Sequence, residues 1–285
     1  MQSKWTSVAL WLGAFVVTVL LAYFQRMTGP SYPLRGTLQA ADGAAVDYGL
    51  PRSDQGRGRL RVRLPIDTPT DEWQLEWRRY PTNEAYRTIP MTGSPDGGIE
   101  AVIPSQPPAG KVEYRIVRRS GGAAELVPAD ETVIARYRGD VPAWVLIPHI
   151  LCMFGGMLVA TRALFEVLRT GRKGSGLVVS VMILLGFGGL FLGPVVQKFA
   201  FGAFWTGWPL GHDLTDNKTL IAVLAWLPAT VAALAGRRLR ALVLVGWFVM
   251  MGVFLIPHSL RGSELDWSQV EGAPEPASKV AEPTR

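Results

Sequence analysis

Cysteine and histidine are scarce in this chain of 285 residues, which contains one cysteine, Cys152, and three histidines. A single cysteine excludes an intramolecular disulfide, so any exported part must be held together by its hydrophobic core. No cluster of cysteine and histidine has the spacing of a zinc finger. Residues 32–139 contain no histidine and no nucleophile and base at a recognisable spacing, so the sequence predicts no enzyme active site there.

Long stretches of one charge are also absent, although the formal net charge is +6. Between Gln25 and Val141, Lys and Arg nearly balance Asp and Glu. The surplus of positive charge comes from short clusters beside apolar runs, at 169–173 and 237–240. This placement is typical of membrane topology determinants, whereas nucleic-acid binding needs a basic stripe on one folded surface. We therefore expect no nucleic-acid partner.

Long apolar runs are what the chain has in abundance. The first, 5–24, has about the length that crosses a bilayer as a helix. No small-x-small cleavage site precedes Gln25, so we interpret residues 1–25 as an uncleaved anchor rather than a signal peptide. Four more runs follow at 141–168, 174–197, 220–235 and 241–257. The sequence thus predicts five transmembrane helices, the last four forming a membrane bundle over residues 141–258.

The region between the first two runs, residues 32–139, has a different pattern. Polar and apolar residues alternate in it with period 2, which indicates half-buried strands. Such segments occur at 59–64, 73–80, 99–103, 112–117 and 132–137, separated by turns rich in Pro, Gly and Asp. Short strands at regular spacing predict an immunoglobulin- or fibronectin-like β-sandwich. The fold class is therefore an α+β membrane protein with a sandwich inserted between helices 1 and 2.

The basic clusters also predict orientation, because Lys and Arg concentrate in cytoplasmic loops. With the 169–173 and 237–240 loops inside, five spans place the N-terminus in the cytoplasm. The sandwich and the C-terminus then lie in the periplasm of a bacterial inner membrane. Residues 259–285 are polar and rich in Pro, Ala and Glu, so we expect a periplasmic tail that is largely disordered.

The segment 198–218 is too polar for the bilayer core and too aromatic for an ordinary loop. Its Phe and Trp side chains suit the headgroup layer on the periplasmic side, which predicts an interfacial loop. Asp213, Thr215 or Asp216 can cap the helix that follows, and Lys198 and Lys218 are placed to pair with the two aspartates. The residues that we expect to form this interface are Trp205, Trp208, Phe204, Asp213, Asp216 and Lys218.

The three histidines fall in one layer near the same face in this topology. His149 and Met153 share a helix face, Cys152 lies close to it, and His258 ends the fifth run. Together with His212, these side chains could bind copper, or two imidazoles could bind a b-type haem. The simpler interpretation is that the histidines hydrogen-bond loops, that the methionines fill gaps, and that no cofactor is bound.

Charged residues inside the spans are few. Arg162 and Glu166 are four residues apart near the cytoplasmic end of the second run and are expected to form a helix pair. The middles of the third, fourth and fifth runs contain no ionisable residue, which argues against a conduction path. A small ion-coupled transporter or sensor that uses Asp213 or Asp216 is therefore a third alternative.

One longer pattern resembles a known group of proteins. The run Trp205–Lys218, W-T-G-W-P-L-G-H-D-L-T-D-N-K, preceded by Gly193–Lys198, is similar to a motif of bacterial inner-membrane proteins with an exported β-domain. Gln106–Lys111 followed by Glu113 and Tyr114 matches the same pattern. The resemblance implies the architecture above for most of the chain and implies no activity.

The sequence therefore favours a non-enzymatic membrane protein whose partners are the lipid bilayer and other proteins. We predict a scaffold, accessory or assembly subunit of a larger membrane complex, respiratory or photosynthetic in kind. The sandwich and the aromatic segment would form its docking surface, because aromatic and Arg side chains are enriched at interfaces. The alternatives are a haem- or copper-binding redox protein and the small transporter or sensor.

Overall fold

The computed structural model describes residues 4–40, 43–54, 59–66, 72–120, 122–170, 174–257, 262 and 264–270. The chain divides into two compact units. A helical unit contains Met1–Pro30 and Val141–Ser263, and a β unit contains Ser31–Asp140 and Glu264–Arg285. The chain therefore passes from one unit to the other three times, after residues 30, 140 and 263.

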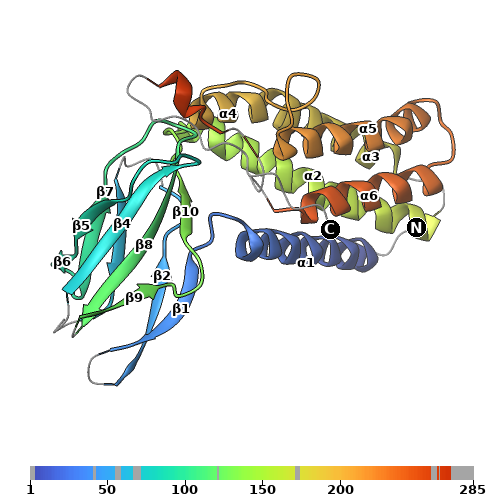
Figure 1. Ribbon diagram of the computed structural model, residues 1–285. Helices are drawn as coiled ribbons and strands as arrows, with labels where there is room; N and C mark the ends of the chain where they lie inside the picture. The colour runs from blue at the N-terminus through green and yellow to red at the C-terminus, as the bar shows by residue number, and fades with distance from the viewer. Residues whose placement is uncertain are drawn as a thin grey trace, which may run out of the picture. The chain divides into compact units, whose positions relative to one another are not determined.

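Among the residues that the structure describes, the helical unit has four helices that are long and apolar enough to cross a membrane. They are α1 (Lys4–Thr28), α2 (Ala143–Thr170), the continuous segment α3–η1–α4 (Ser175–Leu185, Gly186–Leu192, Gly193–Phe201) and α5 (Leu214–Leu234). Figure 1 shows α5 beside α6 (Arg240–Leu255), with the two helices joined by a short connection. Most of the surface of α1 is exposed, and its side chains facing outward are large and apolar.

Four of the five predicted spans are confirmed as helices that are long and apolar enough to cross a membrane. The fifth predicted span is α6, an apolar helix of 16 residues. A helix of this length is about 24 Å long at 1.5 Å per residue, somewhat less than the ~30 Å hydrocarbon core. Helix α6 is therefore shorter than the four long apolar helices.

The third long helix changes its winding where glycine is concentrated. Its central part, η1, is a π-helix of seven residues that includes Gly188 and Gly189. A side chain at Gly188 would place its Cβ 2.4 Å from Cβ of Cys152 on α2, and one at Gly189 would lie 2.5 Å from Cγ2 of Thr219 on α5. The two glycines therefore allow η1 to approach α2 and α5 more closely than any other residue would.

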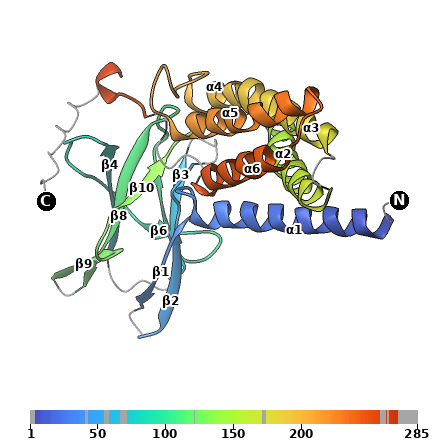
Figure 2. The same ribbon diagram turned by 90° about the vertical axis from the view of Figure 1, so that its right-hand side faces the viewer.

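In its described residues, the β unit contains ten strands in three antiparallel sheets. They are β1 (Leu34–Gln39), β2 (Ala45–Leu50), β3 (Leu60–Leu64), β4 (Glu72–Tyr80), β5 (Arg87–Pro90), β6 (Thr92–Gly93), β7 (Ile99–Ile103), β8 (Lys111–Ser120), β9 (Ala123–Val127) and β10 (Val133–Arg136). Strands β1 and β2 pair only with each other and form a hairpin (Figure 2). The order β10-β8-β4-β5, with β9 also on β8, makes the second sheet, and β3-β7-β6 makes the third.

All three sheets contribute to one hydrophobic core. Alternate residues of β4 (Trp73, Leu75, Trp77) and of β3 (Leu60, Val62, Leu64) are buried in the same cluster. This is the burial expected from the period-2 pattern, and the five strands predicted from it are confirmed as β3, β4, β7, β8 and β10. The hairpin β1–β2 and the short strands β5, β6 and β9 were not predicted.

The β unit also includes part of the segment that the sequence assigned to a polar tail. Residues 264–270 form an extended stretch that ends in the 3₁₀ turn η2 (Trp267–Gln269). Trp267 is only 2% exposed. The prediction of disorder for 259–285 is therefore wrong for residues 264–270, whereas residues 271–285 lie outside the described residues.

Candidate functional site

The aromatic segment begins where α4 ends. Gly202 has a φ of 87° and donates its backbone N–H to the carbonyl of Lys198, so it ends the helix in the left-handed conformation that glycine favours. The Lys198 ammonium group donates back to the carbonyl of Gly202 at 2.7 Å. Residues 202–213, called the aromatic loop below, therefore start at a well-defined position; Figure 1 shows them between α4 and α5.

The loop ends at the N-terminus of α5, which starts at Leu214 and not at residue 220. Asp213 is the N-cap residue, and its Oδ1 accepts a hydrogen bond from the Thr215 amide at 2.7 Å. A carboxylate here satisfies a free N–H group and faces the positive end of the helix dipole. The capping role predicted for this segment is confirmed for Asp213.

Asp216 has another role, because its carboxylate turns back toward the loop. Its Oδ2 accepts hydrogen bonds from the backbone N–H groups of Thr206 at 2.7 Å and Gly207 at 2.9 Å. A Cβ at Gly207 would lie 2.5 Å from Cβ of Asp216, so only glycine permits this approach. One buried carboxylate of α5 thus fixes two consecutive amides of the loop.

Further side chains complete a polar network around Thr206. Gln197 of α4 donates to Oγ1 of Thr206 at 2.6 Å, and this hydroxyl lies 3.3 Å from Oδ2 of Asp213. The side-chain oxygen of Asn217 accepts a hydrogen bond from the backbone N–H of Trp208 at 2.7 Å. Gln197, Asp213 and Asp216 are all buried. The network therefore ties α4, the loop and α5 together, and its buried polar groups are hydrogen-bonded as stability requires.

The loop holds large apolar side chains outward. Phe204, Trp208 and Leu210 are 57%, 66% and 78% exposed. Trp205 is half-buried and donates its indole N–H to the carbonyl of Trp208 at 3.1 Å. Lys198 lies 5.5 Å from the ring centroid of Phe204, a cation–π contact. A loop whose backbone is fixed at three consecutive amides thus leaves three large apolar side chains exposed within seven residues.

Lys218 is buried one turn further into α5. Its ammonium group donates to the carbonyl oxygens of Ile256 at 2.8 Å and Pro257 at 3.3 Å, just beyond the end of α6. The side-chain amide of Gln25, at the end of α1, donates to the carbonyl of Phe254. Both Lys198 and Lys218 thus donate hydrogen bonds to backbone carbonyls. Lys218 of α5 and Gln25 of α1 together satisfy carbonyl groups at the end of α6.

The predicted histidine layer is only partly described. His149 bonds through Nδ1 to the carbonyl of Gly188 in η1 at 2.8 Å, and Cys152 and Met153 lie against Gly188 and Gly189. His212 is exposed in the aromatic loop. His258 lies outside the described residues. Within the part of the chain that the structure describes, no three His, Cys, Asp or Glu side chains come together to hold a metal ion. The haem or copper site stays a prediction.

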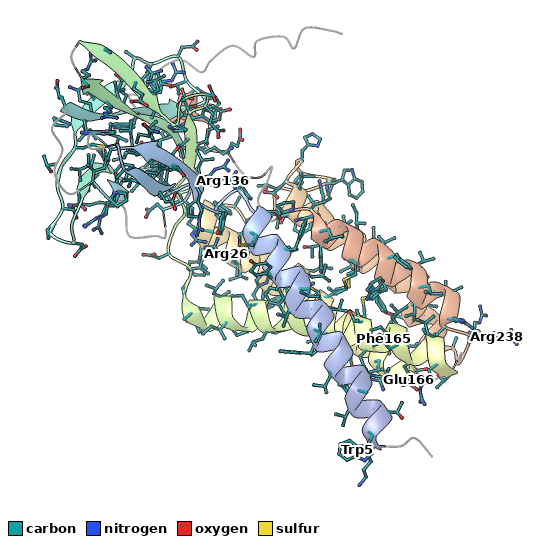
Figure 3. The ribbon with its side chains drawn as sticks, turned by 90° about the horizontal axis from the view of Figure 1, so that it is seen from below. Trp5, Arg26, Arg136, Phe165, Glu166 and Arg238 are labelled. Carbon is teal, nitrogen blue, oxygen red and sulfur yellow. The ribbon has the colours of Figure 1, made fainter. Side chains whose placement is uncertain are left out.

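The far end of the helical unit contains the expected pair of Arg162 and Glu166. Their charged atoms are 2.9 Å apart and both side chains are buried, while Arg169 lies 3.4 Å from the same carboxylate. The Arg162 guanidinium also lies 5.7 Å from the ring centroid of Trp11, and a Cβ added at Gly13 would lie 3.3 Å from the ring of Phe165. Figure 3 shows α1 running from Trp5 to Arg26, with Phe165 and Glu166 on α2.

This end of the helical unit is strongly basic. Its described basic residues are Lys4, Arg162, Arg169, Arg237, Arg238 and Arg240, and Glu166 is the acidic residue among them. The other end contains Asp213 and Asp216 together with Arg26, Lys198 and Lys218, so its positive surplus is smaller. The charge asymmetry matches the one that the sequence used to predict orientation.

Comparison with known proteins adds no further assignment. No protein-family model matches the chain, and no curated protein and no solved structure matches it.

Proposed function

We propose that this protein is a non-enzymatic integral protein of the bacterial inner membrane that acts as a scaffold or assembly subunit of a larger membrane complex. Five helices span the bilayer in this proposal, and the β unit is an immunoglobulin-like periplasmic sandwich. The aromatic loop is the docking surface for partner proteins. The observation that carries the proposal is a hydrogen-bonded loop that holds Phe204, Trp208 and Leu210 exposed.

The fifth span is supported by counting crossings. Residues 264–270 belong to the β unit, as do residues 31–140. The chain that leaves the β unit after Asp140 must therefore return to the same side of the membrane before Glu264. This requires an even number of crossings by the helices between them. With α2, α3–η1–α4 and α5 spanning, α6 supplies the fourth crossing.

The orientation is supported by the basic end of the helical unit. Lys4, Arg237 and Arg238 lie at that end, which the positive-inside rule assigns to the cytoplasm. The β unit, the aromatic loop and the C-terminus then face the periplasm. The contact of Trp11 with Arg162 and the packing of α1 against α2 support α1 as an uncleaved anchor that belongs to the bundle.

A protein-docking role accounts for the rigidity of the aromatic loop. Lipid headgroups accept many conformations, so insertion into the interfacial layer alone does not require a backbone fixed by buried carboxylates. A partner protein gains affinity from a surface that is already ordered, because less conformational entropy is lost on binding. Exposed Trp and Phe are also the side chains that dominate binding energy in protein interfaces.

The test is the size of the complex after mild detergent extraction from native membranes. We expect the wild-type protein to migrate within a larger assembly on native gels. The double variant Trp208→Ala and Leu210→Ala should lose that assembly and keep its own fold. The matched control is Leu227→Ala with Leu234→Ala, which removes exposed apolar side chains of α5 outside the loop. A wild-type protein that is monomeric, with no partner captured by crosslinking, would contradict the proposal.

A further inference from the structure

The β unit contains a slot that is filled by the C-terminal segment. The indole of Trp267 is buried in it and donates its N–H to the carbonyl of Tyr80 at 2.9 Å. The guanidinium of Arg79 lies 4.9 Å from the indole centroid. A Cβ at Gly110 would be 3.2 Å from the indole, so the absence of a side chain there shapes the slot.

Two more contacts hold the residues before Trp267. The backbone N–H of Leu265 donates to the carbonyl of Ala109 at 3.3 Å. The carboxylate of Glu264 pairs with the ammonium group of Lys111 at the start of β8. The segment is thus held by an acidic side chain, a backbone N–H and an indole. These are the kinds of contact by which domains recognise extended peptides.

The receptor side of the slot is fixed by the β unit itself. Ala109 has a φ of 67° and is 4% exposed, so the turn holds a conformation unusual for alanine. Its amide donates to the carbonyl of Tyr137, and the amide of Tyr137 donates to the carbonyl of Gly110. The Tyr137 hydroxyl donates to the carbonyl of Pro104 at 3.0 Å. The turn that accepts the Leu265 N–H therefore has hydrogen bonds of its own to the rest of the β unit.

The fit of the segment is incomplete at one point. Nε and Nη1 of Arg79 are buried, and among the described residues neither has a hydrogen-bond acceptor. The indole offers the guanidinium a cation–π contact only. Two buried N–H groups without acceptors weaken the closed arrangement, which favours an occupant that can leave.

We propose that this slot is a peptide-binding site of the β unit and that the segment Glu264–Trp267 occupies it as an exchangeable intramolecular ligand. The ligand class is an extended segment with an acidic residue three positions before a tryptophan. The same slot then accepts such a segment in trans when the chain's own segment is released. This inference concerns the β unit and does not rest on the docking role of the aromatic loop.

The test uses the full-length protein in detergent and a fluorescent synthetic peptide with the sequence of residues 262–270. In the wild-type protein the tethered segment competes at high effective concentration, so peptide binding is weak. Trp267→Ala releases the tethered segment, and we expect saturable binding at least tenfold tighter than to wild type. Glu264→Lys should give an intermediate affinity, and it keeps Trp267 in place should Trp267→Ala fold poorly.

Exchanged charges provide the control. A Lys111→Glu and Trp267→Ala protein should prefer a peptide with Lys in the place of Glu264, reversing the preference of Trp267→Ala alone. A peptide with Ala in the place of Trp267 should bind at least tenfold more weakly to every variant. Equal binding to wild type and both variants, or no saturable binding to either variant, would overturn the proposal.

Discussion

Replacing Asp216 by Ala tests whether buried carboxylate contacts hold the aromatic loop. The substitution removes the acceptor of the Thr206 and Gly207 amides, which lie 2.7 and 2.9 Å from Oδ2. It leaves Asp213 as the cap of α5, so the helix should still begin at Leu214. The expected result is a loop with a mobile backbone on an intact bundle.

The size of the effect follows from these two bonds. A hydrogen bond to a charged group contributes about 1.5–3 kcal/mol net, so losing two costs at least ~3 kcal/mol locally. Because ~1.4 kcal/mol corresponds to a factor of ten, both amides should exchange with solvent deuterium about a hundredfold faster. Asp216→Asn keeps an oxygen acceptor and loses only the charge assistance, so we expect about a tenfold increase in exchange for it.

Hydrogen–deuterium exchange of peptides that cover residues 202–217 measures this directly. The matched control is Asn217→Ala, which removes the acceptor of the Trp208 amide alone. It should accelerate exchange about fivefold at Trp208, as expected for one neutral bond worth ~1 kcal/mol, and leave Thr206 and Gly207 unchanged. If exchange at Thr206 and Gly207 changes less than threefold in Asp216→Ala, Asp216 does not fix the loop.

Two further predictions concern the other end of the helical unit and the core of the β unit. Glu166→Leu leaves the buried charge of Arg162 without its partner, so it should destabilise the bundle by ~3 kcal/mol or more. The double variant Arg162→Met with Glu166→Leu should recover most of the thermal stability measured in detergent. A double variant as unstable as the single one would refute this. Burial raises the pKa values of Tyr114 and Tyr137 above 10.0, so the unfolded chain releases protons that the folded β unit retains. These two tyrosines should therefore leave stability unchanged well below pH 10 and lower it by up to ~1.4 kcal/mol per pH unit each above it. Absorbance at 295 nm followed with near-UV circular dichroism checks this, and both tyrosines ionising near pH 10 in an intact fold would contradict it.

The sequence predicted what depends on local pattern. Apolar runs of spanning length gave four long helices, because a helix must cover the bilayer with its own residues. Period-2 alternation gave β3, β4, β7, β8 and β10, since one face of each strand is buried. The Arg162–Glu166 pair and the cap at Asp213 also follow from spacing along one helix.

Strands without a clear alternation of polar and apolar residues were not predicted, because the prediction of strands relied on that alternation. Strand β1 contains Gly36, which lies under the ring of Tyr48 on β2. Its place in the hairpin depends on that cross-strand contact rather than on a pattern of its own. The short strands β5, β6 and β9 likewise take their structure from a longer neighbour.

Hydrogen-bond partners that lie far apart in the sequence are determined by the tertiary structure alone. Asp216 was expected to cap a helix, and its bonds to Thr206 and Gly207 exist because η1, α4 and the loop bring those amides back onto α5. Lys218 was expected to pair with an aspartate, whereas it donates to two carbonyls at the end of α6, 38 and 39 residues away. Trp267, an isolated tryptophan in a polar tail, fills a slot built from β4 and the turn before β8. Local pattern specifies which elements form, because propensity and burial act within a few residues. Which polar group satisfies which depends on how those elements pack, because a hydrogen bond requires two groups within about 3 Å wherever they stand in the chain.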